Sequence, residues 1–89
     1  SIFLSSAAYT VSKGNIRLYP NPTTGELTLQ GVESGNTIHI FNAAGKRVVI
    51  MNAHSEFEKA SLHNQPSGLF MVVIHDGTKV IERFKVIKR

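Results

Sequence analysis

Hydrophobic and polar residues alternate along most of the chain, and glycine, proline or asparagine interrupts the alternation at short intervals. A period of two is typical of strands with one buried face, whereas no segment repeats apolar residues with the 3.6-residue period of a helix. The expected strands are Ile16–Tyr19, Glu26–Gln30, Thr37–Phe41, Lys46–Met51, Leu69–Ile74 and Lys79–Lys88. The segment Asn52–Leu62 is less regular, and it fits either a further strand or an irregular turn. The pattern therefore predicts an all-β domain.

Turn-forming residues separate these strands. Proline fixes the backbone and cannot donate a hydrogen bond to a neighbouring strand, so Pro20 and Pro22, on either side of Asn21, should end the first strand. Glycine adopts positive φ without steric cost and stands at several of the expected strand boundaries. The other turn residues that this pattern predicts are Gly25, Asn42, Gly45, Gly68, Asp76 and Gly77.

About seven short strands, with turns every 8–12 residues or so, favour an immunoglobulin-like sandwich of two antiparallel β-sheets. A small β-barrel is the alternative, and the pattern leaves the order of the strands open. Alternation predicts that Ile38 and Ile40 point inward, and that Val48 and Ile50 face the same way. Leu69–Ile74 is apolar at every position, which indicates a strand buried on both faces or central in the sandwich.

The chain divides into a short lead-in and one domain. Residues 1–15 are rich in serine and alanine, and we expect a linker or the end of a preceding region there. Residues 16–89 form the expected domain, whose core is modest because a chain of this size buries only about 60–65% of its unfolded surface. No apolar run approaches the roughly 20 residues that cross a bilayer, so we expect no direct membrane insertion.

The formal net charge of +4 is concentrated near the end of the chain. Residues 1–78 carry equal numbers of basic and acidic side chains, whereas residues 79–89 carry five basic residues and one acidic residue. Nucleic-acid-binding domains usually spread lysine and arginine over a face, often with exposed aromatic residues between them. Only Phe84 lies in this basic stretch, so we expect no nucleic-acid partner. The plainer interpretation is a solvated edge strand that its lysines protect from aggregation.

The sequence predicts no catalytic residue, cofactor or metal site. Asp76 is the only aspartate and falls at an expected hairpin tip, and no Gly-x-Ser-x-Gly elbow is present. The four histidines lack metal-binding spacing, and the absence of cysteine removes disulfides and thiolate ligands. No glycine-rich phosphate loop occurs. We therefore predict that the domain is not an enzyme.

Four blocks, read in order, resemble the C-terminal sorting domains of the type IX (Por) secretion system of Bacteroidetes. The blocks are Tyr19–Leu29, Ile38–Val48, Leu62 with Gly68–Ile74, and Lys85–Arg89. One block would be weak evidence, but four in this order, with the last at the end of the chain, are specific. The resemblance covers roughly residues 16–89. Phe70 stands where the family more often has tyrosine, and Asn52–His63 departs from the family pattern.

This resemblance implies a role in protein export. In the family, a cargo crosses the inner membrane by its own N-terminal signal and folds in the periplasm. The outer-membrane type IX machinery then recognises the C-terminal domain and brings the cargo to the cell surface or the medium. A sortase-like peptidase typically removes the domain. The implied partners are this machinery, the peptidase and an N-terminal cargo, and we expect the cut in the lead-in before Ile16.

The terminal block suggests how recognition takes place. Lys85, Val86, Ile87, Lys88 and Arg89 combine a strand edge, apolar side chains and positive charge. This combination suits β-augmentation by a receptor or docking on an acidic surface, so we predict these five residues as the recognition signal. Weak self-association through an exposed edge is left open.

Two other functions fit an all-β domain. A carbohydrate-binding or adhesin module would need an exposed aromatic platform, yet the chain has no tryptophan, and its only tyrosines are Tyr9 and Tyr19. A structural immunoglobulin-like spacer would be followed by more chain after Arg89. A nucleic-acid binder and an enzyme rank below both.

Overall fold

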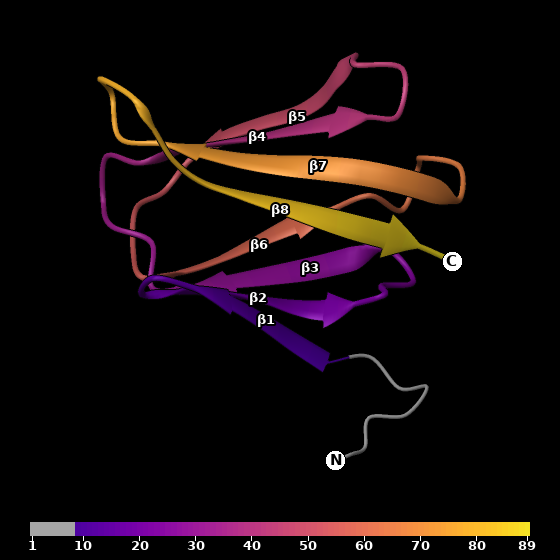
Figure 1. The fold of residues 1–89 in the computed structure, drawn as a ribbon, viewed down its shortest axis with the longest axis horizontal. Helices are drawn as coiled ribbons and strands as arrows, with labels where there is room; N and C mark the ends of the chain where they lie inside the picture. Colours follow the sequence, from indigo (N-terminus) through magenta and orange to yellow (C-terminus); the bar gives the residue numbers. More distant parts are fainter. Residues whose placement is uncertain (1–8) are drawn as a thin grey trace.

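The computed structural model describes residues 9–89, which form two stacked β-sheets (Figure 1). The strands are β1 Tyr9–Lys13, β2 Ile16–Asn21, β3 Glu26–Gln30, β4 Thr37–Asn42, β5 Arg47–Asn52, β6 Phe57–Ser61, β7 Gly68–His75 and β8 Val80–Lys88. The first sheet has the order β1-β2-β3-β6 and the second has the order β5-β4-β7-β8. All pairs of neighbouring strands are antiparallel, which confirms the predicted two-sheet sandwich. No helix in residues 9–89 is long and apolar enough to span a membrane.

Strand β1 lies in the segment that we expected to be a lead-in. It pairs with β2, with Lys13 opposite Ile16 across the turn at Gly14 and Asn15. Tyr-Thr-Val-Ser-Lys does alternate, so the signal for this strand was present, but it is only five residues long. The described chain therefore has eight strands instead of about seven. The rest of the expected lead-in, residues 1–8, lies outside the described residues.

The core fills the space between the two sheets because alternate side chains of each strand point inward. Ile38 and Ile40 are fully buried, which confirms the predicted inward face of β4. Strand β7 lies between β4 and β8 and is central, as its apolar sequence indicated, although only alternate side chains are fully buried. The buried apolar residues are Ile16, Leu18, Leu27, Leu29, Val32, Ile38, Ile40, Ala53, Ala60, Leu62, Phe70, Val72, Ile74, Phe84 and Val86.

Strand β5 departs from the predicted phase. Val49 lies opposite Ile40 but Arg47 lies opposite Phe41, so Val48 is an extra residue in a β-bulge. A bulge shifts the alternation by one residue. The prediction that Val48 and Ile50 face the same way is therefore wrong: Val48 packs against the core, whereas Ile50 points outward and is 55% exposed.

Candidate recognition site at the C-terminal strand

Strand β8 forms one edge of the second sheet and carries the residues predicted as the recognition signal. Its inward side chains include Val86, which is fully buried against the core. Lys85 and Ile87 point outward, opposite Met71 and Leu69 of β7. Lys85 is exposed and Ile87 is 45% exposed. The predicted signal is thus divided between a core residue and residues on the surface.

The other edge of β8 is occupied by the last residue of β2 and by residues just after it. The Asn21 side chain makes two hydrogen bonds to the backbone of β8, although more than 60 residues separate them in sequence. Its Nδ2 donates to the carbonyl of Lys85 (2.8 Å), and its Oδ1 accepts from the N–H of Ile87 (3.1 Å). The side chain therefore acts as a substitute for a neighbouring strand.

Thr23 extends this contact along the strand. Its N–H donates to the carbonyl of Ile87 (2.8 Å), and its carbonyl accepts from the N–H of Arg89 (2.9 Å). These bonds form a short parallel bridge between Thr23 and Lys88. We refer to Asn21–Thr23 as the clasp. It joins the first sheet to the terminal strand of the second.

The clasp is itself held in one conformation by its own hydrogen bonds. The Thr23 side chain is buried, and its hydroxyl accepts from the N–H of Gly25 (3.0 Å) and donates to the carbonyl of Glu26 (2.7 Å). Gly25 has a φ of 151°, and a Cβ at this position would overlap the ring of His63. Glycine is therefore required here for both conformation and space.

The clasp changes what the terminal strand offers to a partner. Four backbone groups on this edge of β8 already hydrogen-bond to the clasp. They are the carbonyl of Lys85, the N–H and the carbonyl of Ile87, and the N–H of Arg89. A receptor strand could pair with this edge only by displacing the clasp. The folded domain instead presents the side chains of Lys85, Ile87 and Arg89 to solvent.

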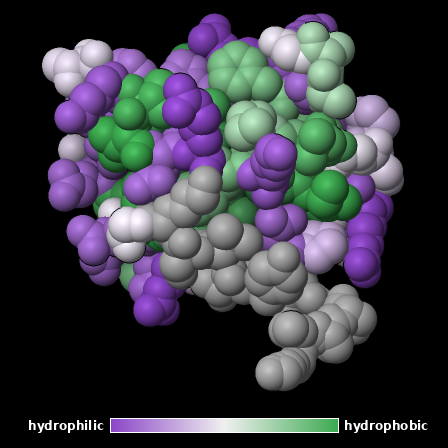
Figure 2. Space-filling model, in the orientation of Figure 1, coloured by the Kyte–Doolittle hydropathy of each residue, from purple (hydrophilic) through white to green (hydrophobic). Residues whose placement is uncertain are grey.

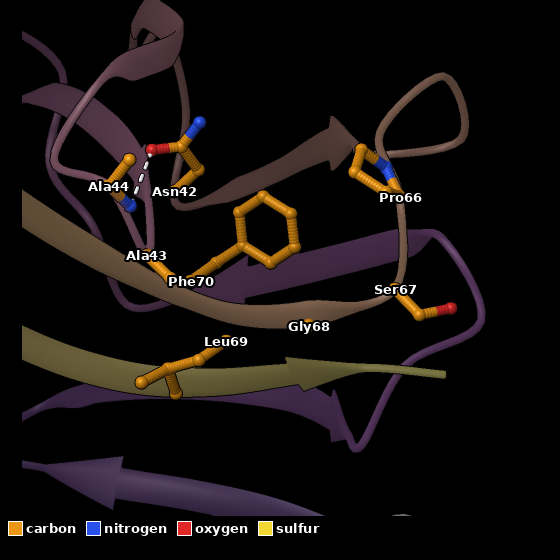
Figure 3. Close-up of a pocket in the computed structure, with 8 residues that line it drawn as sticks. All are labelled: Asn42, Ala43, Ala44, Pro66, Ser67, Gly68, Leu69 and Phe70. Carbon is orange, nitrogen blue, oxygen red and sulfur yellow. Dashed lines mark hydrogen bonds between the residues drawn. The ribbon is translucent and has the colours of Figure 1, made fainter.

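Several predicted turn residues gather at the end of the sandwich where β8 ends (Figure 1). Asn42 closes the β4–β5 turn, where its Oδ1 accepts from the N–H groups of Ala44 (3.0 Å) and Lys46 (2.9 Å). Gly45 lies in the same turn, and Gly68 begins β7 opposite Lys88. The ammonium of Lys88 donates to the carbonyl of Gln65. A hollow of about 190 Å³ lies between the β4–β5 turn and the β6–β7 turn. Figure 3 draws the residues that line it, which are Asn42, Ala43, Ala44, Pro66, Ser67, Gly68, Leu69 and Phe70.

Asp76 and Gly77 lie at the opposite end of the sandwich, in the β7–β8 hairpin. The Asp76 carboxylate accepts hydrogen bonds from the backbone N–H groups of Thr78 (2.9 Å) and Lys79 (3.0 Å) and from the Thr78 hydroxyl. These bonds, led by the one from the Thr78 backbone, lower the pKa of Asp76 to about 2. The carboxylate organises the hairpin and lies far from the clasp.

The histidines do not converge on a site. His63 packs on Gly25, while His75 accepts a hydrogen bond from the N–H of Gly77 through its Nδ1. His39 lies on the outer face of the second sheet, opposite Ile50. Within residues 9–89, no group of three or more histidine, aspartate or glutamate side chains is placed to hold a metal ion.

His39 makes the stability of the domain depend on pH. Its ring stacks on Phe41 with a centroid separation of 6.2 Å, and its buried Nδ1 has no hydrogen-bond partner among the described residues. Burial lowers the pKa of His39, and the positive charges of Arg47 and of His75, when protonated, lower it further. The unfolded chain therefore binds a proton at this position more readily than the folded domain does. Stability from this group is present above the unfolded pKa of about 6.5 and is lost as the pH falls below it.

We expect the melting temperature of the chain to fall between pH 7.5 and pH 5.5. The change His39→Gln should make this fall smaller, because glutamine takes up no proton. The other three histidines are common to both chains, so the difference between the two pH profiles isolates His39. Thermal unfolding followed by circular dichroism gives the measurement, and identical profiles for the two chains would contradict the assignment.

Comparison with known protein families identifies residues 17–89 as matching the family described as "Secretion system C-terminal sorting domain". The match begins within β2 and includes the clasp, the gathered turns and the whole of β8. Comparison with curated protein sequences finds no significant match. The family match thus covers both segments that the structure joins at the terminal strand.

Proposed function

Since the chain belongs to the family of C-terminal sorting domains of the type IX secretion system, we propose that the exposed side chains of its terminal strand are what the secretion machinery reads. The domain is a sorting signal, and such a signal directs export through the outer membrane to the cell surface. Its family is not one of enzymes. The alternatives of a carbohydrate-binding or adhesin module and of a structural spacer are not favoured by this membership.

The observation that supports side-chain recognition is the occupied edge of β8. Backbone pairing with the clasp closes the edge from Lys85 to Arg89, so a receptor that binds the folded domain meets side chains first. Lys85 and Arg89 are exposed cations, and Ile87 is an exposed aliphatic residue beside Leu69. Long-range charge attraction would orient the domain, because the excess positive charge lies in residues 79–89. The proposed partner surface is therefore acidic with an apolar component.

The finer steps of export are part of the same proposal. The cargo would cross the periplasm before it reaches the outer membrane, and a sortase-like peptidase would cut the chain at the junction with the cargo. Peptidases need extended, accessible backbone, and the strand pairing of β1 with β2 protects residues 9–13. We therefore place the cut N-terminal to Tyr9, which excludes the β1 part of the lead-in where the sequence suggested it.

Fusion to an inert passenger tests this proposed function. A passenger protein with its own secretory signal is joined to the N-terminus of the 89-residue chain and expressed in a bacterium with a working type IX system. We expect the passenger outside the cell, and mass spectrometry should find its new C-terminus before Tyr9. Export with a cut inside β1 or beyond would contradict the placement of the junction alone, whereas a passenger that stays inside would contradict the function.

A further inference from the structure

The outer face of the second sheet carries a continuous apolar strip. His39 of β4 lies between Ile50 of β5 and Val73 of β7. On the same face, Phe41 of β4 lies opposite Met71 of β7. Along β7 and β8 the strip continues to the neighbouring pair Leu69 and Ile87. We call this surface the outer face, and its members are His39, Phe41, Arg47, Ile50, Leu69, Met71, Val73, Arg83, Lys85 and Ile87.

Exposed hydrophobic side chains are concentrated on this outer face. Of the four large hydrophobic residues that are exposed in the described chain, Ile50, Leu69 and Ile87 all belong to it. The fourth, Phe57, begins β6 in the other sheet. Figure 2 shows the hydrophobic side chains gathered over the part of the molecule where β4, β5, β7 and β8 lie in Figure 1, with hydrophilic ones between and around them. Contiguous exposed apolar surface of this kind marks interaction sites in soluble proteins.

The charges on the outer face all have the same sign. Arg47 on β5 lies at one side of the strip, and Lys85 on β8 lies at the other. Glu82 lies opposite the inward-facing Ile74, and its carboxylate lies beside Gly14 in the turn between β1 and β2. Asp76 is held in its hairpin, and the other four carboxylates belong to β3, β6 and their loops. The pKa of His39 is lowered first by burial and then by the positive charge of Arg47, which is consistent with this distribution of charge.

We infer that the outer face is a docking surface for a protein partner that presents an apolar patch bordered by carboxylates on both sides. This inference deepens the proposed function, and rests on it, by extending the recognised surface from β8 across β7 and β4 to Ile50 on β5. Burial of the apolar strip against the partner's apolar patch would stabilise the complex. The cations beside the strip would favour a partner whose patch is bordered by carboxylates.

Two other occupants fit the outer face less well. A second copy of the chain would bring the cations of Arg47 and Lys85 against another face that carries no carboxylate, and such like-charge contacts are costly. An anionic membrane is usually bound by clusters of about four to eight cations or by a projecting amphipathic helix. Here Arg47 stands on β5 at one edge of the sheet and Arg83 and Lys85 stand on β8 at the other, and Phe41, Met71 and Val73 between them are half-buried.

The test compares Ile50→Asp with Phe57→Asp. Both parent side chains are about half exposed, at 55% and 51%, so both variants should fold and should lose similar amounts of apolar surface. Binding of each 89-residue chain to the purified outer-membrane type IX complex is measured by biolayer interferometry, with circular dichroism as the check on folding. We expect Ile50→Asp to bind at least tenfold more weakly than the parent and Phe57→Asp to bind within twofold. Arg47→Glu should also weaken binding and reduce its dependence on salt.

Each contrary outcome overturns a defined part of the account. Equal binding by Ile50→Asp and the parent would overturn the outer-face inference. The proposed function would still stand in that case if the double change Lys85→Glu and Arg89→Glu prevents binding. No binding by the parent chain would overturn both. Ile50-dependent binding to phosphatidylglycerol vesicles would make the occupant a membrane, and Ile50-dependent dimers in analytical ultracentrifugation would make it a second copy. Either result contradicts the inference.

Discussion

Reversing two charges on the terminal strand, with the double change Lys85→Glu and Arg89→Glu, should reduce export of a fused passenger at least tenfold. Both side chains are exposed and point away from the core, so the variant should fold like the parent. Two attractive contacts with an acidic partner would become repulsive, and a loss of about 1.4 kcal/mol already corresponds to tenfold weaker binding. Export is measured as the initial rate at which the passenger reaches the medium or the cell surface.

The matched control for this variant is Arg17→Glu with Lys59→Glu. These residues are also exposed, the change in net charge is the same, and both lie on strands of the first sheet, outside β8 and outside the clasp. We expect export within twofold of the parent. Equal losses in the two double variants would show that net charge alone matters and would contradict recognition at the terminal strand.

Deletion of Lys85–Arg89 is a less selective experiment. It removes the proposed signal, but it also removes the fully buried Val86 and every backbone contact with the clasp. Loss of a buried aliphatic residue typically costs a few kcal/mol in a domain whose total stability is of order 5–15 kcal/mol. The deletion would therefore combine a recognition defect with a folding defect, whereas the charge reversal affects recognition alone.

The change Asn21→Ala should destabilise the domain by about 2 kcal/mol. It removes two hydrogen bonds and leaves the carbonyl of Lys85 and the N–H of Ile87 without their partner at a site that is only partly open to water. For a domain of this size the melting temperature should fall by roughly 8–16 °C. Urea unfolding gives the free energy, and amide hydrogen exchange should show faster exchange at Ile87 and Arg89.

Asn64→Ala is the control for the clasp variant. Asn64 is exposed in the β6–β7 turn, and its loss should change stability by no more than about 0.5 kcal/mol. Equal stabilities of the Asn21→Ala and Asn64→Ala chains would mean that the clasp does not hold the terminal strand. The edge of β8 would then be available to a receptor strand, and recognition through exposed side chains would lose its support.

The sequence was informative where the relevant physics is local. Alternation gives the inward faces of β3 and β4, because a strand side chain points to one face or the other according to its position alone. Proline and glycine mark the ends of strands only to within about two residues: β2 was expected to end at Tyr19, before Pro20, but it runs through Pro20 to Asn21. The all-β class and the two-sheet arrangement follow from these local signals.

What the alternation missed depends on contacts between distant segments. The bulge at Val48 reverses the phase of β5, and only the pairing with β4 shows where the extra residue lies. Asn21, which lies between two prolines, was predicted as a turn residue. Its side chain instead hydrogen-bonds to the backbone of β8, more than 60 residues away in the sequence. No local pattern encodes such a contact. The outer face was missed for a similar reason, because Ile50, Leu69 and Ile87 come from β5, β7 and β8, which only the strand order β5-β4-β7-β8 brings into one sheet.

The most direct test of the account is the location of an inert passenger fused to the intact chain in a bacterium with a working type IX system. We expect most of the passenger outside the outer membrane with the intact chain. With the charge reversal at Lys85 and Arg89, we expect the passenger to remain folded in the periplasm. If the passenger is retained as fully with the intact chain as without it, the chain does not act as a sorting signal.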